Sequence, residues 1–299
     1  MSTEIGRYGT WSNFDRVPAS AVIALARRAE ALGYDLFWVN ESAGREPFGL
    51  LGHLAAATER IGLGVGICPI YARDPFTSHA AAATMHELSG GRFVMGLGVS
   101  HDVSVRSLRG QEYRPPLTAM REFLEAYRRA TYRAPLPHGE PPLVVAALRR
   151  RMLELAATAA DGAFPFLVPV GHVARARGIV DDAAAAAGRS RPLLAVTQPV
   201  LLENDPERAR AAGRAHVGGF LDRPNYVRNL LECGFTEEEV ASRADRLVDA
   251  LVGWGDEAAV RARLRAMLDA GADHVALIPL TAEGAMPDAP TVEALAPPW

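Results

Sequence analysis

Two side chains that can exchange protons follow apolar runs that are predicted to be strands. Glu41 comes two residues after the run at 34–39, and His101 comes three residues after the glycine-rich run at 92–98. Carboxylate and imidazole groups are common general acids and bases, and imidazole changes its charge near neutral pH. We therefore expect His101 and Glu41 to be catalytic candidates. The alternative for His101 is a loop histidine that only makes hydrogen bonds.

Glycines gather at the carboxyl ends of two neighbouring runs. Gly64 and Gly66 stand in one run, and Gly96 and Gly98 stand in the next. Glycine in a strand often marks the close approach of a ligand or of a second backbone. Ligands of parallel α/β folds sit at the carboxyl ends of the strands. A flat group resting on this backbone is one interpretation, and relief of crowding inside a barrel is the other.

The segment between these two runs is predicted to be a helix with marked ends. Asp74 can cap its first turn, and Pro75 suits its first position. Gly90 and Gly91 can end it in the left-handed conformation. A strand, a helix and a strand in succession indicate two parallel strands joined by a crossover.

The same alternation continues along the chain and predicts eight strands. These are expected at residues 5–11, 34–39, 61–67, 92–98, 143–147, 162–168, 193–202 and 273–280. Helices are expected at about 19–32, 48–59, 75–89, 115–132, 150–160, 171–187 and 256–271, and another helix begins at 205. A polar loop is expected at 101–110, and only a weak last helix at 291–296.

Eight strands that alternate with helices predict an α/β fold, the closed (β/α)8 or TIM barrel. The rhythm breaks between about Phe220 and Trp254, where we expect a helical insertion over one end of the barrel. Residues 1–299 then form one domain. The rival is an open doubly wound sheet, but no Gly-x-Gly-x-x-Gly follows the first strand.

The composition excludes several classes of function. The chain has 299 residues, of which 49% are hydrophobic and 22% charged, as expected of a globular protein. A net charge of −3 gives no reason to expect nucleic acid or an anionic membrane as a partner. All 32 basic residues are arginine, so lysine chemistry is excluded. Cys68 and Cys233 lack the spacing of metal ligands and are expected to be reduced, and the cytoplasm is the expected location.

Several motifs, in the same order, resemble the luciferase-like monooxygenases, and more narrowly their branch that uses the deazaflavin coenzyme F420. The motifs are Trp38-Val39-Asn40-Glu41, Gly64-Val65-Gly66-Ile67, Tyr71-Ala72-Arg73-Asp74-Pro75, Leu88-Ser89-Gly90-Gly91-Arg92-Phe93, Gly96-Leu97-Gly98-Val99-Ser100-His101, and the segments 156–162 and 253–274. The resemblance covers nearly the whole chain. It implies a barrel that holds the tricyclic coenzyme ring at the carboxyl ends of its strands.

The resemblance also implies which residues hold the coenzyme. The ring would rest on a bulge with a non-proline cis peptide at Gly66-Ile67, bordered by Gly98, Val99, Ser100 and His101. Glu41 would contact the ring or relay a proton. Ala147 and Leu148 would lead to the coenzyme phosphate at the helix that begins near Arg149 and Arg150, where relatives often carry glycine and proline. The alternative for the two arginines is a solvated basic helix end.

Three functions are considered on these grounds. The first is an oxidoreductase that moves a hydride between C5 of F420 and an organic substrate. The second is a monooxygenase that uses reduced FMN and oxygen, and the third is a flavin-binding protein without turnover. No metal is expected. A small organic molecule is the expected partner, and a homodimer is considered alongside a monomer. Trp11, Tyr71 and Trp254 are candidates for the pocket wall.

Overall fold

The computed structural model describes residues 5–298, and its centre is a closed parallel barrel. The barrel strands are β1 (Tyr8–Ser12), β2 (Leu36–Val39), β3 (Gly62–Pro69), β4 (Phe93–Gly98), β5 (Leu143–Val145), β6 (Gly162–Ala163), β7 (Leu193–Leu202) and β9 (His274–Pro279). Each strand pairs in parallel with the next, and β9 pairs with both β7 and β1. The predicted eight-stranded barrel is confirmed, and the open sheet is excluded.

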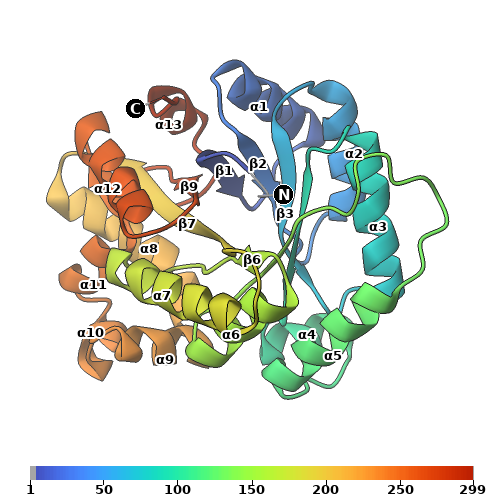
Figure 1. Cartoon of the computed structure of the whole chain (residues 1–299). Helices are drawn as coiled ribbons and strands as arrows, with labels where there is room; N and C mark the ends of the chain where they lie inside the picture. Colours follow the sequence, from blue (N-terminus) through green and yellow to red (C-terminus); the bar gives the residue numbers. More distant parts are fainter. Residues whose placement is uncertain (1–4, 299) are drawn as a thin grey trace.

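Helices surround these strands (Figure 1). They are α1 (Ala19–Ala31), α2 (Pro47–Ala57), α3 (Pro75–Leu88), α4 (Asp102–Arg109), α5 (Pro116–Arg129), α6 (Arg150–Ala159), α7 (Val170–Ala186), α8 (Pro206–Leu221), α9 (Pro224–Glu232), α10 (Glu237–Ser242), α11 (Asp245–Leu251), α12 (Glu257–Asp269) and α13 (Ala289–Ala294).

Helix α3 forms where its capping residues predict. The Asp74 carboxylate accepts the backbone N–H of Thr77 at 2.9 Å, and Pro75 occupies the first turn. Gly90 and Gly91 have φ values of 66° and 85°, which side chains other than glycine rarely adopt. The ends of α3 therefore fix the length of the crossover between β3 and β4.

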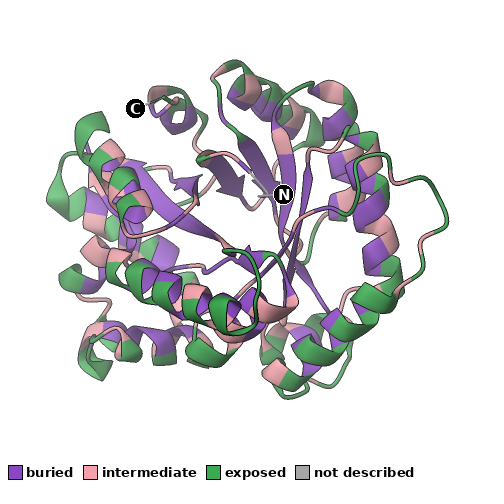
Figure 2. Ribbon diagram, in the orientation of Figure 1, coloured by how far each residue is buried: buried purple, intermediate pink, exposed green. Residues whose placement is uncertain are grey.

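Two apolar layers hold the barrel together. The outer layer lies between the strands and the helices and includes Phe37, Leu63 and Met95. The inner layer fills the barrel and continues under the insertion; it includes Trp38 and Phe164, whose rings stack with centroids 4.7 Å apart. Figure 2 shows the strands buried and the outer faces of the helices exposed. The barrel is thus a packed core, and ligands reach only its ends.

Two local expectations are wrong. Strand β6 has only two residues, because the chain leaves the sheet after Ala163. Residues 102–109 form helix α4 rather than a polar loop, with Val105 buried and Gly110 ending the helix at φ 62°. Val105 is the one buried residue of α4, whereas Val103 and Leu108 are exposed. The apolar residues of the segment therefore do not form the inward-facing stripe by which we recognised the other helices.

The predicted insertion is present and mostly helical. It consists of α9, α10 and α11, followed by the short strand β8 (Gly253–Gly255), which pairs with the carboxyl end of β7. These helices lie together, and α9 and α11 contact α8. In Figure 1, α9 and α10 lie below α7, and α11 lies to its left. Because β8 extends the end of β7, the insertion is anchored at the carboxyl end of the barrel.

Three further observations concern residues 5–298. Cys68 and Cys233 are both unpaired, and Cys68 is buried. No three or more His, Cys, Asp or Glu side chains in this range are grouped so that they could hold a metal ion. None of the helices in the same range has the length and apolar content needed to cross a membrane.

Candidate active site at the carboxyl end of the barrel

The predicted coenzyme-binding residues come from neighbouring strands. Gly66 and Ile67 lie in β3, the segment from Gly98 to His101 ends β4, and Ala147 follows β5. Strands β2, β3, β4 and β5 are consecutive in the sheet, so their carboxyl ends meet along one arc of the barrel rim. The fold therefore places these residues side by side, as the parallel barrel predicts.

Strand β3 carries an irregularity at the predicted ring position. The peptide bond between Gly66 and Ile67 is cis, and the register with β4 shifts between Val65 and Cys68. The indole Nε1 of Trp11 donates a hydrogen bond of 2.5 Å to the carbonyl oxygen of Gly66. Trp11 is therefore part of the site, and it fixes the orientation of this peptide group.

The glycines at these strand ends face protein atoms. A Cβ on Gly66 would lie 2.7 Å from the ring of Phe164, and one on Gly98 would lie 2.6 Å from Cδ1 of Ile67. A Cβ on Gly64 would meet the Trp38 ring, and one on Gly96 would meet the backbone of Val65. The crowding interpretation therefore accounts for all four glycines without a ligand.

His101 lies at the start of α4 and faces the insertion. Its ring is 5.5 Å from that of Tyr226 in α9, centroid to centroid. Burial, together with the Arg223 guanidinium, lowers the pKa of His101 to about 4, while a hydrogen bond with Asn225 acts in the opposite direction. The imidazole is thus neutral at pH 7, which suits it to accept a proton or a hydrogen bond rather than to act as a cationic acid.

Glu41 is held by arginines on the outer side of the strand ends. Its Oε2 atom lies 2.7 Å from Nη1 of Arg73, and its Oε1 atom lies 3.8 Å from Nη2 of Arg109. Arg73 also pairs with the exposed Glu46. Burial and the Glu41 carboxylate raise the pKa of the neighbouring Cys68 thiol well above its usual range. Glu41 thus has a structural role available to it that His101 lacks.

Two residues other than glycine adopt left-handed backbone conformations beside the site. Ser100, after β4, and Leu167, in the loop after β6, both have φ 57°. Such conformations cost about 1 to 3 kcal/mol for residues other than glycine and tend to occur at functional sites. The carbonyl oxygen of Ser100 accepts a hydrogen bond of 3.3 Å from the Tyr113 hydroxyl. The strained backbone at Ser100 directly precedes His101, so this hydrogen bond helps to hold the segment that presents the imidazole.

The start of α6 is basic and has no side-chain cap. Arg149 occupies the N-cap position and makes no capping hydrogen bond, and the first turn contains no acidic residue. Nη1 of Arg149 lies 4.0 Å from Glu232 of α9, and Nη1 of Arg150 lies 3.4 Å from Glu154. Both arginine side chains are largely exposed. Free N–H groups and positive charge favour an anion at this helix end.

Sequence reasoning missed three aromatic side chains that join Trp11 at the rim: Phe166 from the loop after β6, Phe220 from α8 and Tyr226 from the insertion. Phe166 contacts Trp11 at 5.4 Å, Phe220 at 5.0 Å and Tyr226 at 6.2 Å between ring centroids. We call Trp11, Phe166, Phe220 and Tyr226 the rim cluster. Its members are far apart in the sequence, so only the tertiary fold reveals them. For Arg73, in contrast, a signal was present, because it lies within the motif Tyr71 to Pro75.

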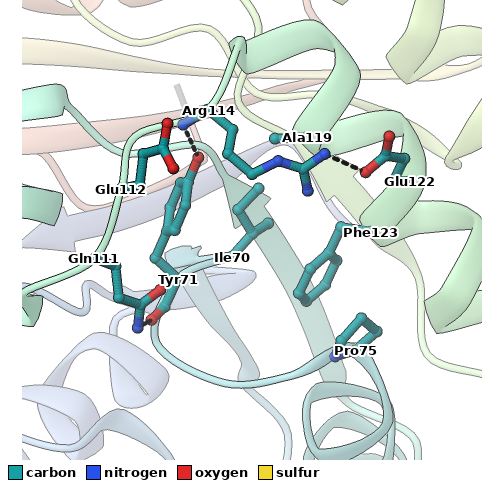
Figure 3. Close-up of a pocket in the computed structure, with 9 residues that line it drawn as sticks. All are labelled: Ile70, Tyr71, Pro75, Gln111, Glu112, Arg114, Ala119, Glu122 and Phe123. Atoms are coloured by element: carbon teal, nitrogen blue, oxygen red, sulfur yellow. Dashed lines mark hydrogen bonds and ion pairs between the residues drawn. The ribbon is translucent and has the colours of Figure 1, made fainter.

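Two hollows lie outside this site. One of about 380 Å³ lies between the segment after β3 and the start of α5, and it is lined by Tyr71, Arg114 and Phe123 among others (Figure 3). The second, of about 280 Å³, includes Trp254, whose indole N–H donates to Asp249 at 2.9 Å. Tyr71 and Trp254 therefore wall other hollows, and of the three predicted wall residues only Trp11 reaches the rim cluster.

These features define an α/β-barrel protein with a candidate active site where the strands end. A sequence profile described as luciferase-like monooxygenase matches residues 4–274, so the chain belongs to the luciferase-like monooxygenase family. The resemblance seen in its motifs is confirmed.

Individual relatives are similar to this chain over different lengths. A 5,10-methylenetetrahydromethanopterin reductase of Archaeoglobus fulgidus is 27% identical over 261 residues, which cover 75% of this chain and 77% of that protein. A putative coenzyme F420-dependent oxidoreductase of Mycobacterium tuberculosis is 32% identical over 152 residues, or 51% of this chain and 42% of that protein.

A solved structure supports the fold along the whole chain. The coenzyme F420-dependent tetrahydromethanopterin reductase of Methanopyrus kandleri superposes with a TM-score of 0.79 at 20% identity, covering 98% of both chains. Homologues of this chain are thus oxidoreductases, and the chain is assigned to the same broad class of enzyme.

Proposed function

We propose that this protein is a coenzyme F420-dependent oxidoreductase that transfers a hydride between C5 of the deazaflavin and a small organic substrate. The names of the mycobacterial relative and of the Methanopyrus kandleri enzyme support the coenzyme. The arrangement of residues at the carboxyl end of the barrel supports the site.

The donor groups at the starts of α6 and α7 fit the coenzyme phosphate. Asp74, Asp205 and Asp256 cap α3, α8 and α12 with their carboxylates. Helices α6 and α7 begin at Arg149 and Pro169 without a side-chain cap, as do α1, α4, α5, α9 and α11. A carboxylate cap would compete with an anion for the same N–H groups. Arg149 and Arg150 add charge-assisted hydrogen bonds, for which arginine geometry is well suited.

The ring would lie against β3 and β4. Gly66, Ile67, Gly98, Val99, Ser100 and His101 are the residues that would border it, with Ala147 and Leu148 between the ring and the phosphate. Ile67, Val99 and Leu148 are each partly exposed, so apolar surface is available there for a flat ring.

The chemistry divides between coenzyme and protein. When bound, the deazaflavin supplies a carbon centre, C5, that accepts or donates a hydride. The protein positions the ring through the Gly66 peptide held by Trp11, and the rim cluster excludes water. The neutral imidazole of His101 accepts a proton or a hydrogen bond at its ring nitrogen. Glu41 orients Arg73 and Arg109 at the outer edge.

The family name itself favours one alternative, a monooxygenase that uses reduced FMN and oxygen. The observation that carries our proposal is the uncapped, basic start of α6 on the same barrel rim as His101 and Gly66. That observation fits the phosphate of either coenzyme, so the two must be compared directly. The third function, flavin binding without turnover, differs from both in having no substrate.

Calorimetric titration with F420 and with FMN tests the proposal. We expect F420 to bind at least about tenfold more tightly, a difference of about 1.4 kcal/mol. Tighter binding of FMN would instead support the monooxygenase. The cytoplasmic location stays a prediction, and the choice between a homodimer and a monomer stays open; sedimentation equilibrium of the purified protein decides the second.

A further inference from the structure

Arg223 is a cation at the barrel rim that lacks a carboxylate partner. It occupies the N-cap position of α9, and its guanidinium carbon lies 5.3 Å from the centre of the Phe220 ring. Within residues 5–298 no carboxylate forms an ion pair with it. By contrast, Arg210 and Arg214 of the preceding helix both pair with Asp245. The structure thus leaves one positive charge at the rim available.

The apolar surface beside Arg223 is aromatic and partly exposed. Phe220 and Tyr226 lie 5.8 Å apart between ring centroids, and Phe166 contacts both. Tyr226 is buried, while Phe166 and Phe220 retain exposed faces. Flat aromatic rings offer stacking or edge-to-face contact with another planar group, typically with centroids about 4.5 to 7 Å apart.

His101 connects this surface to the proposed ring site. It contacts Tyr226 on one side and ends the segment from Gly98 that borders the proposed coenzyme position. Trp11 makes a second connection, because it contacts Phe166 and donates to the Gly66 carbonyl. A molecule bound between Arg223 and the aromatic rings therefore lies next to the atoms that the proposed reaction uses.

We propose that this site takes a planar, conjugated organic acid, with its flat portion against the exposed faces of Phe166 and Phe220 and its carboxylate at Arg223. This inference rests on the proposed function for the reaction, but the binding preference can be measured without turnover. Arg223 supplies the positive charge that binds the anion. His101 is neutral and therefore does not compete with Arg223 for that anion. The carboxylates of the coenzyme are a competing source of an anion for Arg223. The test distinguishes these coenzyme carboxylates from the carboxylate of a substrate.

Binding of two isosteric probes tests the inference. We would titrate cinnamate and its neutral amide, cinnamamide, into the protein saturated with F420. Cinnamate is expected to bind about tenfold more tightly, since a charge-assisted contact adds roughly 1.4 kcal/mol or more. Arg223→Gln should remove this preference by weakening cinnamate alone. Phe220→Leu should weaken both probes to a similar extent, because it removes the aromatic surface.

The chain offers a matched control on the same helix. Arg228 is exposed on α9, so Arg228→Gln changes the net charge by the same amount at a different place. It should leave the affinities of both probes unchanged, and circular dichroism checks the fold of every variant. Equal affinity for the two probes in the wild type, or an equal effect of Arg228→Gln and Arg223→Gln, would overturn the inference.

The affinity for the coenzyme separates this inference from the proposed function. F420 should bind to Arg223→Gln as tightly as to the wild type. If Arg223→Gln weakens F420 instead of cinnamate, Arg223 belongs to the coenzyme site and the inference is wrong. If the wild type does not bind F420, the proposed function fails; the same probe titrations on the protein without coenzyme then decide the substrate class by the same criteria.

Discussion

The ring of His101 lies 5.5 Å from the ring of Tyr226, centroid to centroid, and this contact joins the barrel to its insertion. His101 comes from the end of β4, whereas Tyr226 comes from α9. The insertion therefore sets the environment of the residue that the sequence singles out as catalytic. Burial beneath α9, reinforced by Arg223, keeps the imidazole of His101 neutral at pH 7.

The first prediction concerns the pH dependence of turnover. If the neutral imidazole of His101 accepts a proton, kcat/KM should stay level from about pH 9 down to about 5 and fall near pH 4, because the pKa of His101 is lowered to about 4. His101→Ala should abolish this acid limb and lower turnover by about 10² to 10⁴. Steady-state rates across this pH range check it, with binding of F420 as the control. A limb near the ordinary histidine value of about 6.5 in the wild type would contradict the assigned environment.

The second prediction separates a catalytic role of Glu41 from a structural one. Glu41→Gln leaves the half-buried Arg73 with Glu46 as its remaining carboxylate partner. We expect the free energy of unfolding to fall by about 1 to 3 kcal/mol. Turnover at saturating F420 should fall far less than in His101→Ala. Denaturant unfolding and single-turnover rates measure the two effects.

Glu46→Gln is the matched control for Glu41, because the same arginine binds both residues and the Glu46 side chain is 55% exposed. An exposed ion pair contributes at most about 1 kcal/mol. The Glu46 carboxylate also accepts the Gly49 N–H at the start of α2, and the amide oxygen of glutamine can accept the same hydrogen bond, so this variant should be close to the wild type in stability. A large loss of turnover in Glu41→Gln with unchanged stability would make Glu41 the proton carrier.

The third prediction concerns the start of α6. Replacing Arg149 and Arg150 by alanine should weaken binding of F420 by about 1.5 to 3 kcal/mol for each arginine that holds the phosphate. Stability should change little, because both side chains are exposed and pair only loosely with Glu232 and Glu154. Calorimetry at low salt measures the affinity.

A double variant at Arg121 and Arg265 provides the control for overall charge. Both of these arginines are exposed, and neither lies at the start of α6. If this pair weakens binding as much as the α6 pair, or if the α6 pair leaves affinity unchanged, no phosphate binds at this helix end.

The fourth prediction concerns acid stability. His274 is fully buried inside the barrel; its Nδ1 atom donates to the carbonyl oxygen of Gly6 at 2.9 Å, and its Nε2 atom accepts from the Trp38 indole at 3.0 Å. These partners require the neutral ring, and burial lowers the pKa of His274 to about 4. The unfolded chain therefore binds a proton that the folded one does not between about pH 6.5 and 4. The contribution of neutral His274 to the free energy of unfolding should be complete above about pH 6.5. It should decrease toward pH 4, by at most about 1.4 kcal/mol per unit of pKa difference.

His274→Gln should flatten this acid limb and lower stability at pH 7, whereas the exposed His53→Gln should leave both unchanged. Urea unfolding between about pH 4 and 8 measures the free energies. If the free energy of unfolding of His274→Gln falls as steeply toward low pH as that of the wild type, other groups cause the loss of stability in acid. His172 and His216 are the next candidates, because burial also lowers their pKa values to about 4.

Local signals predict most of the fold. The Asp74-Pro75 and Asp205-Pro206 pairs begin helices where expected, because a cap acts on its own first turn. Helix α4 escapes prediction because its exposed face carries most of its residues. Strand β6 is shorter than predicted, because the apolar residues from Phe164 onward fill the barrel and its rim rather than extend the sheet.

The candidate site is predicted only in part, for a related reason. His101 stands out in the sequence because it follows a strand, and Gly66 because it is a glycine within a strand. The partners that set their properties, Tyr226 and Trp11, come from distant segments and meet them only after the barrel closes. Sequence spacing along one element carries no information on such contacts. The ion pair of Glu41 with Arg73 has the same origin, because it joins two different loops.

Hydride transfer to and from F420 can be observed directly in a single-turnover experiment. Reduced F420 bound to the protein would be mixed without oxygen with menadione, a quinone that accepts a hydride, and the absorbance of the oxidised coenzyme would be followed. We expect oxidation that depends on the protein, is slowed several-fold by deuterium at C5, and is lost in His101→Ala. Oxidation that requires oxygen, or that shows no isotope effect and is the same with and without the protein, would contradict it.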